Sequence, residues 1–135
     1  AVACARLAKP DTHIDFICRL GKDSVGDDML QSWLKDGISA EVIDLRSLVP
    51  IDYYRVLESV KKTGRAVVVH AAVEFCGVGA EICSTINEEL WGQLKAPAVR
   101  LGAAYAPMAY SSAIEFSQVP DAGAIAARVR ASIKS

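Results

Sequence analysis

The sequence predicts an α/β fold: a three-layer αβα sandwich on a mainly parallel, or mixed, sheet of about five strands. Short β-rich runs alternate along the chain with longer amphipathic stretches, which is typical of βαβ units. One run, residues 66–71, is almost continuously apolar, as expected of a strand that helices cover on both faces. The strand-to-strand connections are expected to be right-handed.

The composition fits one ordinary domain over residues 1–135. Of these residues 52% are hydrophobic and 23% charged, and 15 basic side chains nearly balance 16 acidic ones. A net charge of −1 gives no reason to expect nucleic acid or an anionic membrane as a partner. No apolar run reaches the roughly 18 residues of a membrane span. No secretory signal is visible and the first residue is not Met, so we expect a cytoplasmic chain that is a fragment or a processed product.

The cysteines and histidines argue against a metal site. The four cysteines contain no Cys-x-x-Cys pair, and the two histidines lie far from any cluster with ligand spacing. Three of the cysteines lie in apolar stretches, where a thiol behaves as a small hydrophobe. We therefore expect free, buried thiols in a reducing compartment.

The first expected elements are a strand, a helix and a second strand. Residues 13–18 form a β-rich run, and residues 40–45 alternate between apolar and polar. Between them, Ser24 is placed to cap the start of a helix and Gly37 to end it. Apolar side chains recur at helical spacing along this segment.

The middle of the chain repeats this arrangement. Asp52 is placed as the N-cap of a second helix, which Gly64 ends. The apolar strand over residues 66–71 follows. A loop to Gly79 then leads into a long helix whose inward positions extend to Leu94.

The last expected elements are a strand over residues 97–101, a loop over residues 102–112 and a helix that Asp121 caps. Apolar residues share one face of this helix, and basic residues lie near its C-terminus, where the helix dipole favours cations.

Ligands of such folds collect beyond the carboxyl ends of the strands. Three segments lie there: residues 46–52, 72–79 and 102–112. In the second, Gly77, Val78 and Gly79 enter a helix N-terminus, whose free N–H groups would bind an anion. The third glycine of a dinucleotide fingerprint is absent. The alternative is that the glycines let a tight turn pass close to the sheet.

No self-sufficient catalytic constellation is present. His70 ends the buried strand without a neighbouring side chain that could orient it as a general base, so a core or rim histidine is expected. Cys76 lies near a helix start, which favours the thiolate, but it has no paired base. Asp44 and Arg46 are expected to form a structural ion pair. We predict no catalytic residue in this domain.

The four tyrosines form two pairs next to loops. Aromatic residues concentrate at protein interfaces. Tyr53, Tyr105 and Tyr110 are therefore candidate interface residues, with Tyr54 and Trp91 as further candidates.

Four segments together resemble the C-terminal domain of the transketolase-like superfamily. They are Glu41–Asp52, Ser59–His70, Gly77–Ile82 and Leu94–Pro97. In particular the chain resembles the β subunit of thiamine-diphosphate-dependent 2-oxoacid dehydrogenases (pyruvate, branched-chain 2-oxoacid, acetoin), from about Ile14 to Ile133. The resemblance implies a sheet with one antiparallel edge strand.

The resemblance also implies a role in assembly. In that family a pyrimidine-binding domain precedes this domain, and thiamine diphosphate and Mg²⁺ bind between other domains, so none is expected to bind here. The domain extends the subunit interface, in a homodimer or an α/β heterotetramer, and helps to dock an acyltransferase core. The isolated chain is then expected to be inactive, as one part of an oxidoreductase.

Three departures from the family lie in strand-end loops. Ala71 replaces the usual Glu, Leu20 stands in place of a Gly, and Tyr105 and Ala109 stand where the family often has Asp and Pro. These departures leave open the substrate and the partner contacts. The alternative functions are a stand-alone module that binds an anion or nucleotide at the glycine turn, and an independent enzyme that uses Cys76 or His70.

Overall fold

The computed structural model describes residues 4–5, 13–18 and 39–134. Within them, five strands form one sheet in the order β1-β3-β2-β4-β5. The strands are β1 (Cys4–Ala5), β2 (His13–Cys18), β3 (Ser39–Val42), β4 (Ala66–Val73) and β5 (Val99–Ala103). The pairs β3–β2, β2–β4 and β4–β5 are parallel, and β1 pairs antiparallel with β3. The expected mixed sheet with one antiparallel edge strand is therefore confirmed.

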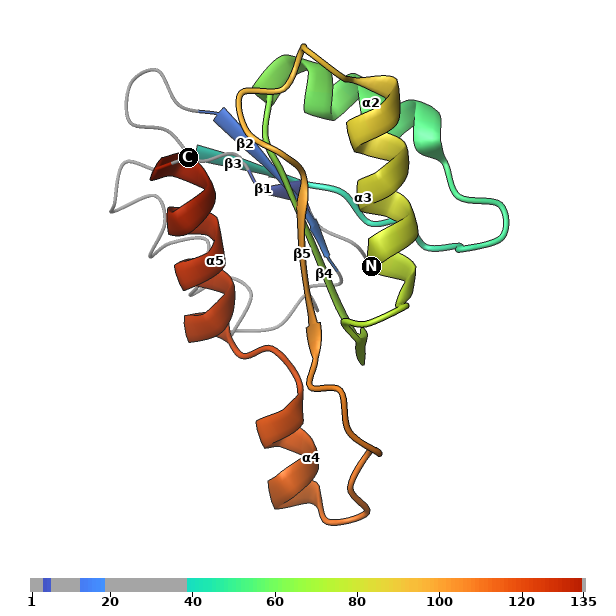
Figure 1. Ribbon diagram of the computed structural model, residues 1–135, viewed down its shortest axis with the longest axis vertical. Helices are drawn as coiled ribbons and strands as arrows, with labels where there is room; N and C mark the ends of the chain where they lie inside the picture. The colour runs from blue at the N-terminus through green and yellow to red at the C-terminus, as the bar shows by residue number, and fades with distance from the viewer. Residues whose placement is uncertain (1–3, 6–12, 19–38, 135) are drawn as a thin grey trace.

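Helices cover both faces of this sheet, as the sequence predicted (Figure 1). Helices α2 (Tyr53–Thr63) and α3 (Val78–Glu89) pack on one face, and α5 (Ala122–Lys134) packs on the other. A short helix, α4 (Ser112–Gln118), lies away from the sheet, beyond the end of β5. The helix expected after Ser24 falls outside the described residues.

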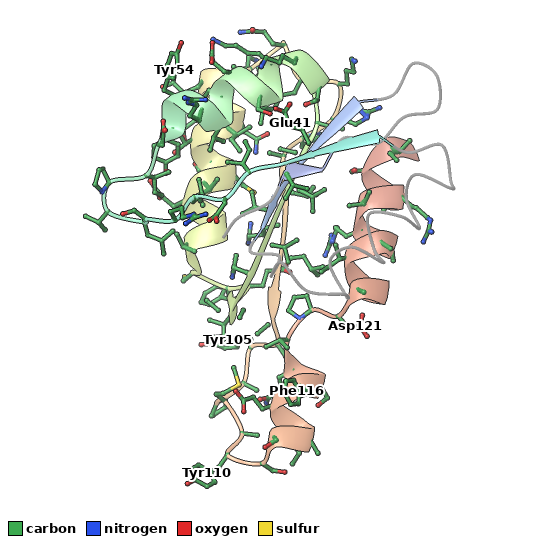
Figure 2. All side chains as sticks on the ribbon, turned by 180° about the vertical axis from the view of Figure 1, so that it is seen from behind. Glu41, Tyr54, Tyr105, Tyr110, Phe116 and Asp121 are labelled. Atoms are coloured by element: carbon green, nitrogen blue, oxygen red, sulfur yellow. The ribbon has the colours of Figure 1, made fainter. Side chains whose placement is uncertain are left out.

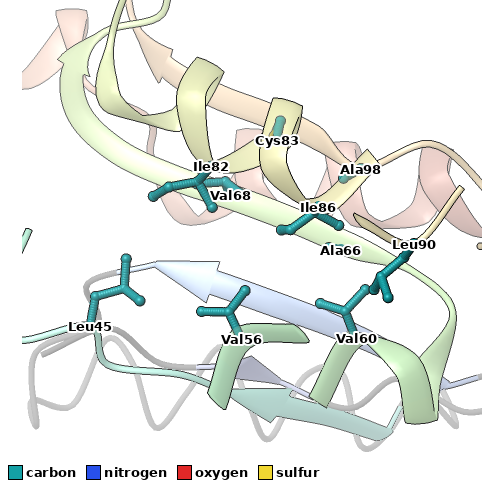
Figure 3. Close-up of a cluster of buried hydrophobic side chains, with 10 residues drawn as sticks. All are labelled: Leu45, Val56, Val60, Ala66, Val68, Ile82, Cys83, Ile86, Leu90 and Ala98. Atoms are coloured by element: carbon teal, nitrogen blue, oxygen red, sulfur yellow. The ribbon is translucent and has the colours of Figure 1, made fainter. Parts of the chain in front are cut away.

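A cluster of buried side chains holds α2 and α3 against the sheet (Figure 3). Val56, Val60, Ile86 and Leu90 are at most 1% exposed, and Val68 of β4 lies beneath them. Fully burying one such side chain contributes about 1.5–3 kcal/mol. This cluster therefore fixes where α3 begins relative to the carboxyl end of β4.

Helix α2 begins and ends at the residues that the sequence predicted. The carboxylate of Asp52 accepts a hydrogen bond from the Arg55 backbone N–H at 3.1 Å. Gly64 ends the helix in the left-handed conformation, with φ of 76°. That conformation costs glycine nothing because it has no Cβ.

Several predicted strand boundaries are wrong. Strands β4 and β5 each continue two residues beyond their expected ends, to Val73 and Ala103. Strand β3 ends at Val42, because the chain then turns so that Leu45 is buried in the core instead of continuing the strand. Strand β5 begins at Val99 and not at residue 97. Pro97 has no N–H to donate, and the Ala98 N–H donates to Asn87 Oδ1 on α3 at 3.0 Å.

Two helix predictions also need correction. Helix α3 ends at Glu89, and Leu94 lies in the following turn, where Gly92 has a φ of 77°. Helix α4 begins at the last residue of the predicted loop, Ser112, and occupies a stretch to which the sequence assigned no element. The last helix begins as expected, since Asp121 Oδ1 accepts from the Ala124 N–H at 2.7 Å.

Candidate functional site

The pairing of β4 with β5 is irregular near the carboxyl ends of the two strands. Their register shifts between Val69 and Val73. Beyond the shift, the Glu74 N–H donates to the Ala103 carbonyl at 3.0 Å, and Arg100 Nε donates to the Glu74 carbonyl at 3.1 Å. Glu74 Oε2 in turn accepts from the Gly102 N–H at 3.3 Å. The end of β4 is therefore held against β5 by polar contacts on both sides of Glu74.

His70 lies on β4 under the start of α3. Its Nδ1 is 3.0 Å from the Ala72 carbonyl oxygen, which only accepts, so the neutral ring carries its hydrogen on Nδ1. Its Nε2 is buried and has no hydrogen-bond partner in the described part of the chain. Burial lowers the pKa of His70 below 6.5, and Arg100 also lowers it, while the Ala72 carbonyl and Glu74 act in the opposite direction.

The glycines of the predicted anion-binding turn pack on this histidine. A Cβ on Gly79 would lie 2.3 Å from His70 Nε2, and a Cβ on Gly77 would lie 2.2 Å from the Val73 carbonyl oxygen. Both distances are shorter than real Cβ contacts. The turn therefore passes as close to the sheet as the alternative interpretation expected. Anion binding at Gly77, Val78 and Gly79 stays a prediction.

The two cysteines with described side chains are free, as expected. Cys83 of α3 is buried, and burial raises its pKa to about 12, which makes it inert as a nucleophile. Cys76 is exposed, contrary to the expectation of a buried thiol, and has a φ of 53°. The side chains of Cys4 and Cys18 lie outside the described residues.

An arm projects from this end of the molecule (Figure 2). We use this name for residues 104–120, which leave the sheet after β5, include α4 and return to α5. The Ala104 N–H donates to the Gln118 carbonyl at 3.0 Å. The side-chain amide of Gln118 accepts from the Ala109 N–H at 3.0 Å and donates to the Pro107 carbonyl at 3.2 Å. Gln118 thus closes the base of the arm and holds its outgoing segment through Pro107 and Ala109.

The surface of the arm is apolar and uncovered. Glu115 is its only charged residue, and none of the residues of α4 is buried. Its exposed large apolar side chains are Tyr105, Met108, Tyr110, Ile114 and Phe116. Tyr110, near the tip in Figure 2, is fully exposed, and Phe116 of α4 is 74% exposed.

Two of the three candidate tyrosines, Tyr105 and Tyr110, lie on the arm, at its opposite ends (Figure 2). The Tyr105 ring meets the Phe75 ring edge-on with centroids 5.1 Å apart. Tyr53 is half-buried on α2, at the other end of the molecule, and its neighbour Tyr54 is exposed. The role of these tyrosines in an interface stays a prediction.

Sequence reasoning missed the apolar residues that surround these tyrosines. Phe75, Met108, Ile114 and Phe116 were not singled out. The signal was a segment of 17 residues with several large apolar side chains and one charge. The expected ion pair at the end of β3 is present, with Arg46 Nε 2.9 Å from Asp44 Oδ2.

The described residues contain neither a cluster of metal-ligating side chains nor a helix fit to span a membrane. No group of three or more His, Cys, Asp or Glu side chains that could hold a metal ion lies among residues 4–5, 13–18 and 39–134. In the same part of the chain, none of the helices combines the length and the apolar character needed to cross a bilayer.

Known proteins resemble this chain along most of its length. Residues 29–125 match the model of the family described as transketolase, C-terminal domain. The chain is 48% identical over 86 residues to the mitochondrial pyruvate dehydrogenase E1 component subunit beta of Pisum sativum, a match that covers 64% of this chain and 24% of the relative.

Two bacterial relatives match more of the chain. The acetoin:2,6-dichlorophenolindophenol oxidoreductase subunit beta of Cupriavidus necator is 39% identical over 100 residues, which are 74% of this chain and 30% of the relative. The pyruvate dehydrogenase E1 component subunit beta of Leifsonia xyli subsp. xyli is 35% identical over 121 residues, 90% of this chain and 36% of the relative. The chain thus spans about a quarter to a third of the length of these relatives.

Proposed function

Because the chain belongs to the transketolase C-terminal domain family, we propose that it is the non-catalytic assembly domain of a 2-oxoacid or acetoin dehydrogenase β subunit. In the intact complex such an enzyme carries out an oxidative decarboxylation. The similarity to β subunits named for pyruvate and acetoin chemistry supports this proposal. The observation that carries it is the uncovered apolar surface of the arm.

That surface fits an interface better than a small-ligand site. An exposed apolar patch on a folded domain marks an interaction site, and aromatic residues and Met with few charges are the composition of interface cores. Tyr110 and Phe116 project from the arm, whose base is held by hydrogen bonds of Gln118. We propose that the arm packs on other domains of the assembly, with Tyr105 and Tyr110 among the contact residues.

The partners follow from the family. We propose that this domain extends the contact between two β subunits, in a homodimer or an α/β heterotetramer, and contributes to docking an acyltransferase core. A cytoplasmic location stays a prediction, and the Pisum sativum relative is named as mitochondrial.

Thiamine diphosphate and Mg²⁺ belong, in this proposal, to other domains of the assembly. When bound there, the cofactor would supply a nucleophilic carbon that adds to the 2-oxo group and an electron sink for the loss of CO₂. Two observations on the described residues support this placement. The glycine turn at α3 packs on the His70 ring, and no group of three or more His, Cys, Asp or Glu side chains lies together there. We derive no catalytic step for this domain.

A chimera tests the proposal. The matched segment of the Leifsonia xyli subunit would be replaced by this chain and co-expressed with the corresponding α subunit. We expect the chimera to assemble and to decarboxylate pyruvate, whereas the subunit without the segment does neither. Assembly and activity of the truncated subunit at the level of the chimera would contradict the proposal.

Single substitutions in the chimera test the arm. Tyr110→Asp and Phe116→Asp place a charge in the proposed contact and should weaken assembly at least about tenfold, since buried aromatic anchors carry 2 kcal/mol or more. Val49→Asp is the matched control, because Val49 is an exposed apolar residue outside the arm. Equal losses in all three variants would show that the arm is not the contact.

A further inference from the structure

His70 supports the place where the arm is attached. The ring lies between β4 and the first turn of α3, with Nδ1 held by the Ala72 carbonyl. The backbone of Gly77 and Gly79 packs directly on the ring, as the positions of their missing Cβ atoms show. The segment that connects β4 to α3 therefore depends on the ring staying in place.

A protonated ring does not suit this position. Protonation would add an N–H at Nε2, which is buried without an acceptor in the described part of the chain, and a buried unpaired polar group is costly. Arg100 of β5 lies on the same side of the sheet, and the positive end of α3 lies above the ring. Cys83 of α3 stays a neutral thiol. Glu74 is the one described acidic group that acts on the ring in the opposite direction.

The same connecting segment continues to the arm. Glu74 is hydrogen-bonded to Ala103 and Gly102 at the end of β5. The next residue, Phe75, places its ring against Tyr105 at the start of the arm. If the His70 ring moves out to solvent, the packing under Gly77 and Gly79 is lost. The Phe75–Tyr105 contact is then held only from one side, by the hydrogen bonds of Glu74 to β5.

We infer that His70 is a pH-sensitive support of the arm: the neutral ring holds Phe75 against Tyr105, and protonation releases this contact and weakens docking through the arm. The link between His70 and Tyr105 is independent of what the arm binds. The effect on docking rests on the proposed function.

NMR titration of the 135-residue chain tests the link directly. The Cε1 proton of His70 should titrate with a midpoint below 6.5, the usual pKa, and the ring resonances of Tyr105 and Phe75 should shift with the same midpoint. His13 provides a second histidine signal in the same spectra. A midpoint at or above 6.5, or a titration of His70 that leaves Tyr105 unchanged, would overturn the inference.

The variant His70→Asn removes the titrating group and keeps a side-chain N–H for the Ala72 carbonyl. Assembly of the chimera would be measured at about pH 8 and about pH 5.5, which bracket the histidine range. Between the higher and the lower pH, the affinity of assembly should fall more in the chimera with His70 than in the Asn variant. The additional fall should be about fivefold or more, which is the lower end of usual coupling factors. Equal falls would overturn the effect on docking.

Failure of the proposed function is a separate result. A chimera that does not assemble at any pH contradicts the assembly role, and the NMR titration still decides whether His70 controls Tyr105. If His70→Asn does not fold, the wild-type titration alone gives that decision.

Discussion

The α3 face of the sheet and the arm are both apolar, but only one of them is covered. Val60, Ile86 and Leu90 are at most 1% exposed under the two helices, whereas Tyr110 and Phe116 of the arm face solvent. The first set uses the hydrophobic effect to fold the domain. The second leaves the same driving force available for association. Burial, rather than composition, thus separates the part that stabilises this domain from the part proposed to bind.

The largest effect is expected from the covered region. Ile86→Ala removes a fully buried side chain from the cluster between α3 and β4. The free energy of unfolding should fall by about 3 kcal/mol, as for other large-to-small core changes. Urea unfolding followed by circular dichroism measures it. A loss below about 1 kcal/mol would mean that the cluster repacks.

A smaller loss is expected where α3 meets His70. Gly79→Ala would place a Cβ 2.3 Å from His70 Nε2, and overpacking of this kind costs about 1–3 kcal/mol. The same change in a His70→Ala background should cost much less, because the obstructing ring is gone. Gly123→Ala is the control, since its Cβ meets only the flexible end of Asp121 at 3.3 Å. Equal effects of Gly79→Ala in both backgrounds would contradict the contact.

Stability should depend on pH through His70. Its pKa in the folded chain is lowered from 6.5, so the unfolded chain binds the proton first as the pH falls. The free energy of unfolding should therefore be at its full value above pH 6.5 and decrease below it, until the lower folded pKa is reached. Thermal unfolding of the wild type and of His70→Asn over this range measures the difference. Parallel curves would exclude His70 as the source.

The uncovered region should contribute least to stability. Phe116→Ala in the isolated chain should change the free energy of unfolding by less than about 0.5 kcal/mol, since surface substitutions usually stay within that limit. Urea unfolding checks this value. A loss comparable to that of Ile86→Ala would show that the arm is part of the core.

Phosphate separates the two interpretations of the glycine turn. If Gly77 and Gly79 serve only to let the turn pack on His70, millimolar phosphate should leave the melting temperature unchanged. A ligand that binds the native state would raise it. A reproducible rise would favour the stand-alone anion-binding alternative.

Local signals predicted the fold well. Asp52 and Asp121 begin helices and Gly64 ends one, through contacts within a few residues of themselves, which a sequence displays directly. The apolar run of β4 likewise indicated a strand covered on both faces. The strand ends were less predictable, because the limit of β5 depends on Asn87, which lies 11 residues before Ala98 in the chain.

The candidate site was only partly predictable. The sequence identified the glycine turn and the tyrosines, but it could not show that the glycines accommodate His70. That fact depends on how α3 crosses β4 in three dimensions. Nor could it show that Tyr105 meets Phe75, since the two residues are 30 positions apart. The apolar character of the arm could be seen in its composition. Its apolar residues do not recur at the spacing of a helix or a strand, so the sequence did not predict their arrangement.

Gln118 closes the arm onto itself, so the conformation of the arm depends little on the rest of the domain. Hydrogen bonds at the base of the arm fix both Ala104, where the chain leaves the sheet, and Gln118, near where it returns. Residues between them can change without disturbing the strands or helices of the body. Two departures from the family, Tyr105 and Ala109, fall within this stretch. A descendant of this protein could therefore acquire a new partner by altering the arm alone, while the sheet and its core were inherited intact.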